Sequence, residues 1–149
     1  MNHKSIKKSY RLVENLSDMA VEAWGENPEE LFASIGTGMF SAITDIDKVN
    51  PKFKVDITLE EEPGGSYEDA VISWLQELIY RFEADKMLFC RFEIENIGLD
   101  EKILVKACGW GEPVDKERHN INIGIKAATY HQLKVVKNQQ WHCKVIFDI

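Results

Sequence analysis

The sequence predicts an α+β fold in which two helices pack on one face of a mixed, mostly antiparallel β-sheet. Two stretches carry apolar residues at helical spacing, and several others alternate apolar and polar residues as half-buried strands do. The expected order is strand, strand, helix, strand, helix and then a run of strands. That order lacks the regular alternation of a parallel α/β fold, so most strands should pair as antiparallel neighbours.

Length and composition indicate a single domain over residues 1–149. Hydrophobic residues make up 44% of the sequence and charged residues 29%, which is the balance of an ordinary globular protein. The net charge of −7 disfavours direct binding to nucleic acid, because such binding needs a cationic surface. No apolar run approaches membrane-spanning length, and the start resembles no signal peptide, so we expect a cytoplasmic protein that contacts no membrane.

The first part of the chain should contain two strands and a helix. Residues 8–13 alternate as a short strand, and a second strand begins at Asp18 and ends at Gly25. Asn27 is a favourable helix cap, and Pro28-Glu29-Glu30 follows it. Proline suits the first helical position, and acidic residues complement the helix dipole. Apolar residues then recur at helical spacing, so one face of this helix should pack on the sheet.

The exit of this helix contains two acidic residues, Asp45 and Asp47, that could belong to a metal loop. An EF-hand loop needs further oxygen ligands, a glycine and a distant glutamate, and the sequence lacks them here. A solvated exit turn is therefore expected. A third strand follows at residues 53–60, where the alternation leaves one face toward water.

A longer helix and a run of strands make up the rest of the chain. Ser66-Tyr67-Glu68-Asp69 is a variant of the capping box and should start the helix, whose apolar stripe is expected to pack on the sheet. Strands are expected at residues 88–94 and 103–110, and Gly111-Glu112-Pro113 should end the second one. The alternation that begins at Ile121 predicts another strand that runs through Thr129.

The chain ends inside a predicted core strand, in which alternate residues from Trp141 onward are apolar. The terminal carboxylate of Ile149 should therefore be held at a strand end beside Asp148. If the start of the second strand lies next to it, Asp18 brings a third carboxylate to the same place. Carboxylate oxygens suit Ca²⁺ or Mg²⁺ and not Zn²⁺. The alternative is that the carboxylates at the strand end simply face solvent.

The cysteines indicate neither a zinc site nor a disulfide framework. Cys90, Cys108 and Cys143 are widely spaced, and each lies in an apolar segment, so buried free thiols are expected. A nucleophilic pair of Cys143 with His131 stays open, because only the geometry of the two side chains decides it. The sequence contains no serine elbow, zinc-protease motif or phosphate-binding loop that would indicate catalysis of those kinds.

The order and spacing of six segments resemble the archease family over nearly the whole chain. The most specific of them is the run that begins with Lys126, Lys-Ala-Ala-Thr-Tyr-His-Gln-Leu-Lys-Val. The six segments are Glu14–Met19, Phe40–Val49, Trp74–Tyr80, Met87–Phe89, Lys126–Val135 and Phe147–Ile149.

The resemblance implies an accessory protein and not an enzyme. Archease activates the RtcB-type RNA ligase: it promotes GTP-dependent guanylylation and multiple turnover in tRNA splicing or RNA repair. Such a protein would reach RNA only through the ligase. Members of the family bind a divalent cation through residues that correspond to Asp18, Asp148 and the terminal carboxylate of Ile149. By the same resemblance, Lys126 is the residue expected to contact the ligase.

The chain departs from the family pattern at two places. Asn15 and Leu16 replace a histidine and a threonine of the motif that ends in the metal-binding aspartate, and Asn122-Ile123-Gly124 replaces a Gly-Thr-Glu sequence. Two other functions are therefore considered. One is a chaperone-like protein-binding module with a structural metal ion, and the other is a small metal-dependent hydrolase.

Overall fold

The computed structural model describes residues 9–14 and 18–149, and it confirms the α+β class. The described strands form two sheets, where the sequence alone predicts one, and every pairing within them is antiparallel. The first sheet has the order β1 (Tyr10–Glu14), β2 (Asp18–Gly25), β8 (Trp141–Asp148) and β6 (Ala127–Thr129), with β7 (Val136–Lys137) also paired to β8. The second has the order β3 (Phe53–Glu61), β5 (Ile103–Pro113) and β4 (Met87–Gly98).

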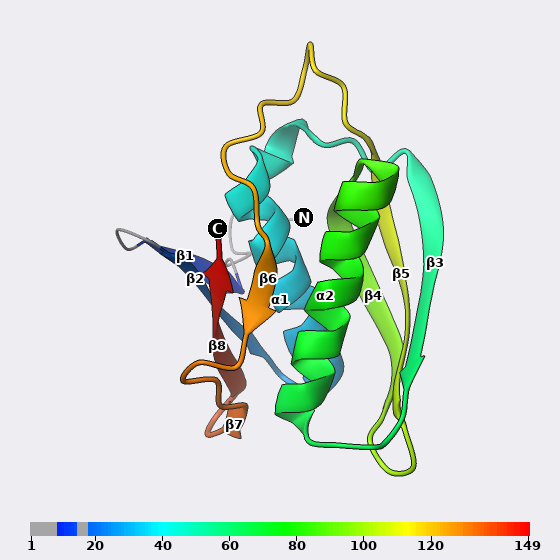
Figure 1. The fold of residues 1–149 in the computed structure, drawn as a ribbon, viewed down its shortest axis with the longest axis vertical. Coiled ribbons are helices and arrows are strands. Elements are labelled where there is room, and N and C mark those ends of the chain that lie inside the picture. The colour runs from blue at the N-terminus through cyan, green and yellow to red at the C-terminus, as the bar shows by residue number, and fades with distance from the viewer. Residues whose placement is uncertain (1–8, 15–17) are drawn as a thin grey trace, which may run out of the picture.

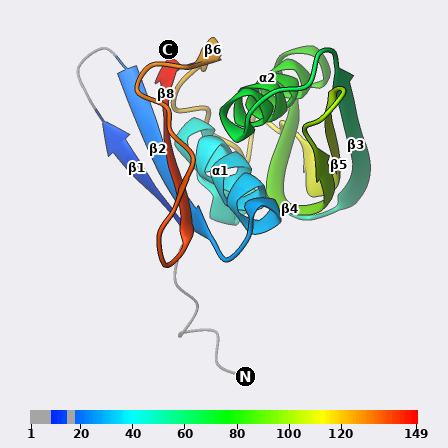
Figure 2. The same cartoon turned by 90° about the horizontal axis from the view of Figure 1, so that it is seen from below.

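The two helices lie between the sheets, so that each sheet has helices on one face only (Figures 1 and 2). Helix α1 (Pro28–Ile43) contacts β2 on one side and β4 on the other, and α2 (Tyr67–Asp85) contacts β5 and β6. Both helices therefore join the two sheets through one continuous apolar core. None of the described helices is long and apolar enough to cross a membrane.

Both predicted helix caps are present. The side chain of Asn27 accepts a hydrogen bond of 2.8 Å from the backbone N–H of Glu30 at the start of α1. At the start of α2, Ser66 and Asp69 form a reciprocal capping box. Each cap satisfies N–H groups that the first helical turn leaves without a partner, so local sequence fixes where both helices begin.

Gly38 shows why a helix-weakening residue lies in the middle of α1. A Cβ atom at this position would lie 2.5 Å from Cγ1 of Val21 in β2 and 3.1 Å from Cβ of Tyr10 in β1. Both distances are shorter than ordinary van der Waals contact. The absence of a side chain therefore lets the first sheet approach the helix closely, which brings β2 into the core.

The predicted strand end at residues 111–113 is wrong, because β5 runs through Pro113. Gly111 does not break the strand but allows a close approach of β4: a Cβ atom there would lie 1.8 Å from the carbonyl oxygen of Leu88. Glycine in a strand often marks such an approach between two backbones. The strand therefore continues to Glu112, whose side chain is buried.

The predicted strand from Ile121 to Thr129 is also wrong, apart from the three residues of β6. The preceding residues belong to a connection, residues 114–126, that crosses from the second sheet to the first (Figure 1). Its middle is held by an isolated bridge between Thr44 and Ile121, by a 2.7 Å hydrogen bond from Asn122 N–H to the carbonyl of Ile43, and by a 2.8 Å hydrogen bond from the Thr44 hydroxyl to the carbonyl of Asn120. Alternation without a neighbouring strand does not form a ladder.

The exit of α1 is the solvated turn that the sequence predicts. Asp45 and Asp47 are exposed at the short 3-10 helix η2 (Ile46–Lys48), where the Asp45 side chain caps the backbone N–H of Asp47. None of the three cysteines forms a disulfide within the described residues. Cys143 is buried, and Cys90 and Cys108 are half-buried.

Candidate metal-binding site

Asp18 and Asp148 are direct partners across β2 and β8. Asp18 is the first residue of β2, Asp148 is the last of β8, and the antiparallel register places their Cα atoms opposite each other. Opposed residues of such a pair project from the same face of the sheet, with Cβ atoms about 5 Å apart. The structure therefore brings together the two aspartates that the sequence singles out.

One side-chain oxygen of Asp18 lacks a hydrogen-bond partner among the described residues. This atom, Oδ1, is buried, and no group within residues 9–14 and 18–149 forms a hydrogen bond with it. A buried carboxylate oxygen without a partner is costly, and the nearby carboxylate of Asp148 adds repulsion. A cation bound between Asp18 and Asp148 would offset both the cost of the unpartnered oxygen and the repulsion between the carboxylates. The two aspartates therefore suit a divalent ion that takes oxygen ligands.

Lys126 and Ile149 lie at the same end of the sheet. The backbone N–H of Lys126 donates a 2.8 Å hydrogen bond to the carbonyl oxygen of Asp148, and Ala127 is the partner of Asp148 in the β6–β8 register. Figure 1 shows the C-terminus at this end of β8, beside β6. Lys126 is exposed, so its ammonium group is available beside an otherwise acidic site. Its contact with a partner protein stays a prediction.

The two aspartates alone are too few ligands for a metal ion. In the described part of the chain, no three histidine, cysteine, aspartate or glutamate side chains gather closely enough to hold one. The role of the terminal carboxylate of Ile149 as a further donor stays a prediction, and water would fill the remaining positions. Ca²⁺ takes six to eight oxygen ligands and Mg²⁺ usually keeps several waters, so an open site at a strand end suits either ion.

The departures from the family pattern have different places in the molecule. Asn15 and Leu16 lie outside the described residues. Asn122 and Gly124 are exposed in the connection that leads to Lys126, and a Cβ atom at Gly124 would meet no other atom within 4 Å. These two positions therefore belong to the surface of the connection and not to the core.

Sequence reasoning missed a buried charged cluster that anchors this connection. The carboxylate of Glu112, at the end of β5, accepts hydrogen bonds from Arg118 (2.7 Å), from the backbone N–H of Asn50 (2.8 Å) and from His119 (3.0 Å). His119 Nδ1 accepts the backbone N–H of Asp115 at 2.8 Å, so Nε2 carries the proton that His119 donates. The cluster fixes the start of the connection whose last residue is Lys126.

The environment of Glu112 keeps it ionised. Burial by itself would raise the pKa of this carboxyl group, but the hydrogen bonds from Arg118, Asn50 and His119 outweigh burial and lower the pKa from 4.5 to about 2. The sequence shows these residues only as a mixed-charge loop after a strand. No local pattern distinguishes a buried carboxylate from a solvated one.

The nucleophilic pair of Cys143 with His131 is not formed. Cys143 is buried in the core face of β8, whereas His131 is exposed in the turn after β6. Burial raises the pKa of the Cys143 thiol to about 12, which removes the thiolate that a nucleophile needs.

Comparison with known proteins gives one consistent result. Residues 10–149 match the model of the Archease protein family (MTH1598/TM1083). The chain is 34% identical over 138 residues to protein archease of Methanopyrus kandleri, which covers 92% of this chain and 96% of the relative. It is 28% identical over 145 residues to protein archease of Danio rerio, which covers 97% of this chain and 87% of the relative.

The fold also matches a solved structure. The solution structure of Methanobacterium thermoautotrophicum protein 1598 aligns with a TM-score of 0.75 at 19% sequence identity, and the alignment covers 96% of this chain and 100% of that one. At this identity the match concerns the fold alone. The family match over residues 10–149 and the 34% identity to the Methanopyrus kandleri protein establish that the chain belongs to the archease family.

Proposed function

We propose that this chain is a cytoplasmic accessory protein that activates an RtcB-type RNA ligase. In this role it promotes GTP-dependent guanylylation and multiple turnover of the ligase in tRNA splicing or RNA repair, and it reaches RNA only through the ligase. The observation that carries the proposal is the pairing of Asp18 with Asp148, with one buried Asp18 oxygen left without a hydrogen bond in the described chain. Membership of the archease family gives that site its context.

The site would hold Ca²⁺ or Mg²⁺ through Asp18, Asp148 and the terminal carboxylate of Ile149. The ion would supply positive charge between carboxylates that otherwise repel each other. The residues of the chain do the positioning. The β2–β8 register sets the spacing of the aspartates, and the bond from Lys126 N–H to the Asp148 carbonyl fixes the strand end.

Activation requires that the chain bind one state of the ligase more tightly than the other, since a partner with equal affinity for both states shifts nothing. The acidic site beside Lys126 offers a charged surface that could bind one state of the ligase more tightly than the other. Lys126 would contact the ligase, and the held ion would keep the end of β8 in one arrangement. The guanylylation chemistry itself belongs to the ligase.

A guanylylation assay of the ligase, with and without this chain, tests the proposal. We expect the wild-type chain to accelerate guanylylation, and Asp18→Asn and Asp148→Asn to lose most of that effect. Asp56→Asn is the matched control, because Asp56 is an exposed aspartate on β3 of the other sheet. The proposal fails if the wild-type chain has no effect, or if all three variants act alike.

The same preparation separates the two alternatives. Recovery of many unfolded proteins with the chain, and no ligase, would favour the chaperone-like module with a structural ion. Hydrolysis of phosphate esters with Mg²⁺, abolished by Asp18→Ala, would favour the hydrolase.

A further inference from the structure

Strand β1 is an edge strand of the first sheet, paired with β2 alone in the described parts of the chain (Figures 1 and 2). The N–H of Trp24 donates a 2.8 Å hydrogen bond to the carbonyl of Ser9, so this hydrogen bond shows which residues of β1 bond to β2. In an antiparallel pair, bonded and non-bonded positions alternate. Backbone groups of Arg11 and Val13 therefore point toward β2, and those of Tyr10 and Leu12 point away from it, to the side where no described strand pairs with β1.

A groove runs along this edge, between β1 and the end of α1, and it is named the β1 groove here. Its volume is about 350 Å³, and its lining includes Tyr10, Arg11, Leu12, Asp45, Ile46 and Asp47. The Leu12 side chain is 36% exposed although it lies on the helix side of the sheet, where its partner Val21 is fully buried. Edge strands are usually protected from pairing by charges, proline or bulges. Arg11 gives β1 one such charge, and Leu12 adds an exposed apolar contact at the same edge.

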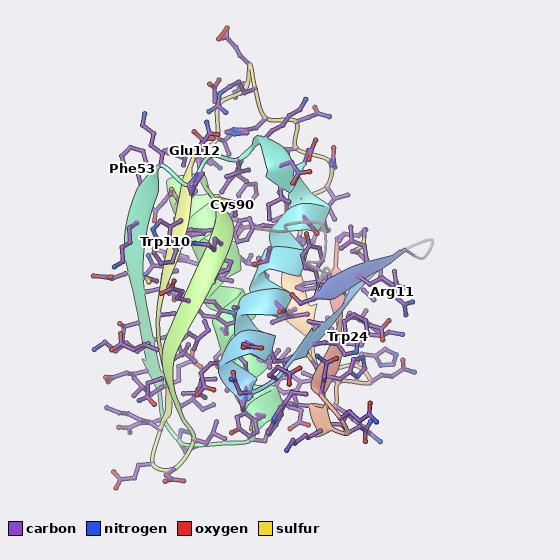
Figure 3. The ribbon with its side chains drawn as sticks, turned by 180° about the vertical axis from the view of Figure 1, so that it is seen from behind. Arg11, Trp24, Phe53, Cys90, Trp110 and Glu112 are labelled. Carbon is purple, nitrogen blue, oxygen red and sulfur yellow. The ribbon has the colours of Figure 1, made fainter. Side chains whose placement is uncertain are left out.

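The β1 groove is negatively charged at the end of α1, which favours binding of a cationic side chain. Helix α1 ends at Ile43 without a basic residue in its last turn, so the negative end of its dipole is not compensated there. Asp45 and Asp47, both exposed, add two carboxylates directly beyond that helix end. Arg11 also lines the groove, but its guanidinium pairs with Glu22 of β2, which offsets its charge (Figure 3 shows Arg11 on β1).

We propose that β1 docks an extended segment of a protein partner, which joins the first sheet as an added strand. The segment would bond to the outward backbone groups of Tyr10 and Leu12, as peptides do when they extend a sheet. Its side chains facing the helix would be an apolar residue against Leu12 and Ile46 and, two residues away, a lysine or arginine facing Asp45 and Asp47, since alternate residues share a face.

The identification of the partner as the ligase rests on the proposed function. β1 leads through residues 15–17 to Asp18, the first residue of β2. A strand added to β1 would therefore bind next to the hairpin that carries one metal-binding aspartate. Docking at this edge would place the partner within reach of the candidate site.

Hydrogen exchange of the full chain with two probe peptides tests the docking directly. The basic probe is acetyl-Thr-Val-Thr-Lys-Thr-Val-Thr-amide, and the matched control replaces its lysine by glutamate. In the free chain, we expect the amide of Leu12 to exchange fast and that of Val13 to be protected. The basic peptide at millimolar concentration should slow exchange at Leu12, and it should bind about tenfold more tightly than the acidic one, as the loss of one charge-assisted contact implies.

Leu12→Pro tests the edge in the complex with the ligase. Proline removes the outward N–H and leaves the bonds between β1 and β2 intact, which is how proline is tolerated on edge strands. Leu12→Val, which keeps the N–H, is the matched control. We expect Leu12→Pro to weaken ligase binding by about tenfold or more, with thermal unfolding close to that of Leu12→Val.

Three results would overturn the docking proposal. The first is an unchanged Leu12 amide with the basic peptide, or equal binding of both peptides. The second is a Leu12 amide that is already protected in the free monomer, because a segment of the chain itself would then cover the edge. The third is a dimer that Leu12→Pro dissociates, because a second copy would then be the occupant. Failure of the wild-type chain to stimulate guanylylation, by contrast, counts only against the proposed function.

Discussion

Asp18 and Asp148, one near each end of the chain, are directly opposed in the pairing of β2 with β8. Two carboxylates held in this way on one face of a sheet repel each other unless a cation lies between them. The hydrogen bond from Lys126 to the Asp148 backbone adds a third segment to the same place. The site is therefore a product of tertiary pairing, and its properties should depend on ions in ways that single substitutions reveal.

Asp148→Asn should separate the repulsion from ion binding. In EDTA the variant should be as stable as the wild type or more stable by up to about 1 kcal/mol, because an opposed pair of like charges is removed. With Ca²⁺ at a hundred times its Kd, the wild type should gain about 2.7 kcal/mol, whereas the variant should gain much less. Thermal unfolding with and without the ion measures both effects. Equal gains in the two proteins would contradict the site.

Lys126→Ala should lower stimulation of the ligase without weakening ion binding. Its backbone bond to Asp148 does not depend on the side chain, and removal of a positive charge beside an acidic site favours a cation there. Lys134→Ala, at another exposed lysine of the same segment, is the matched control. Guanylylation rates and a Ca²⁺ titration give the two readouts. Loss of ion binding in Lys126→Ala would mean that the side chain supports the site itself.

Glu112→Gln should reduce the dependence of the free energy of unfolding on pH below about pH 4.5. The pKa of Glu112 is lowered in the folded state to about 2 from 4.5, so its stabilising contribution is fully present above pH 4.5 and is lost as the pH falls toward 2. The contribution is on the order of 3 kcal/mol for a buried group with three donors. Denaturant unfolding between pH 7 and pH 2 measures it. The exposed carboxylate of Glu93 is the control: Glu93→Gln should leave the pH dependence unchanged.

Gly38→Ala should destabilise the protein although alanine is the better helix former. The added Cβ would lie 2.5 Å from Val21 and force β2 away from α1, which costs about 1–3 kcal/mol as overpacking does. Gly124→Ala is the control, because a Cβ there meets nothing within 4 Å. A chemical denaturation midpoint for each variant decides the matter. An unchanged or higher midpoint for Gly38→Ala would show that the sheet adjusts without cost.

The features that the sequence predicts correctly are local. Asn27 and Ser66 are caps because each satisfies N–H groups within its own first turn, and β8 alternates because one of its faces is buried. Strand Asp18–Gly25 has the predicted bounds, since its end coincides with a glycine before a capped helix. Such signals need no knowledge of the neighbours.

The features that the sequence does not predict depend on distant partners. The residues after Ile121 alternate as a strand does, but they cross between two sheets, and no described strand pairs with residues 122–126. Glu112 lies in a stretch that resembles a strand end, and only Arg118, His119 and the backbone of Asn50 make its burial possible. The pairing of Asp18 with Asp148 is of the same kind. Residue chemistry suggests it, but the register of β2 with β8 creates it.

Calorimetric titration of Ca²⁺ and Mg²⁺ into the purified chain tests the central claim most directly. The account predicts one binding site in the wild type and in Asp56→Asn, and affinity reduced by at least about tenfold in Asp18→Asn, because a charged ligand is lost. Undiminished binding by Asp18→Asn, or no binding of either ion by the wild type, would contradict it.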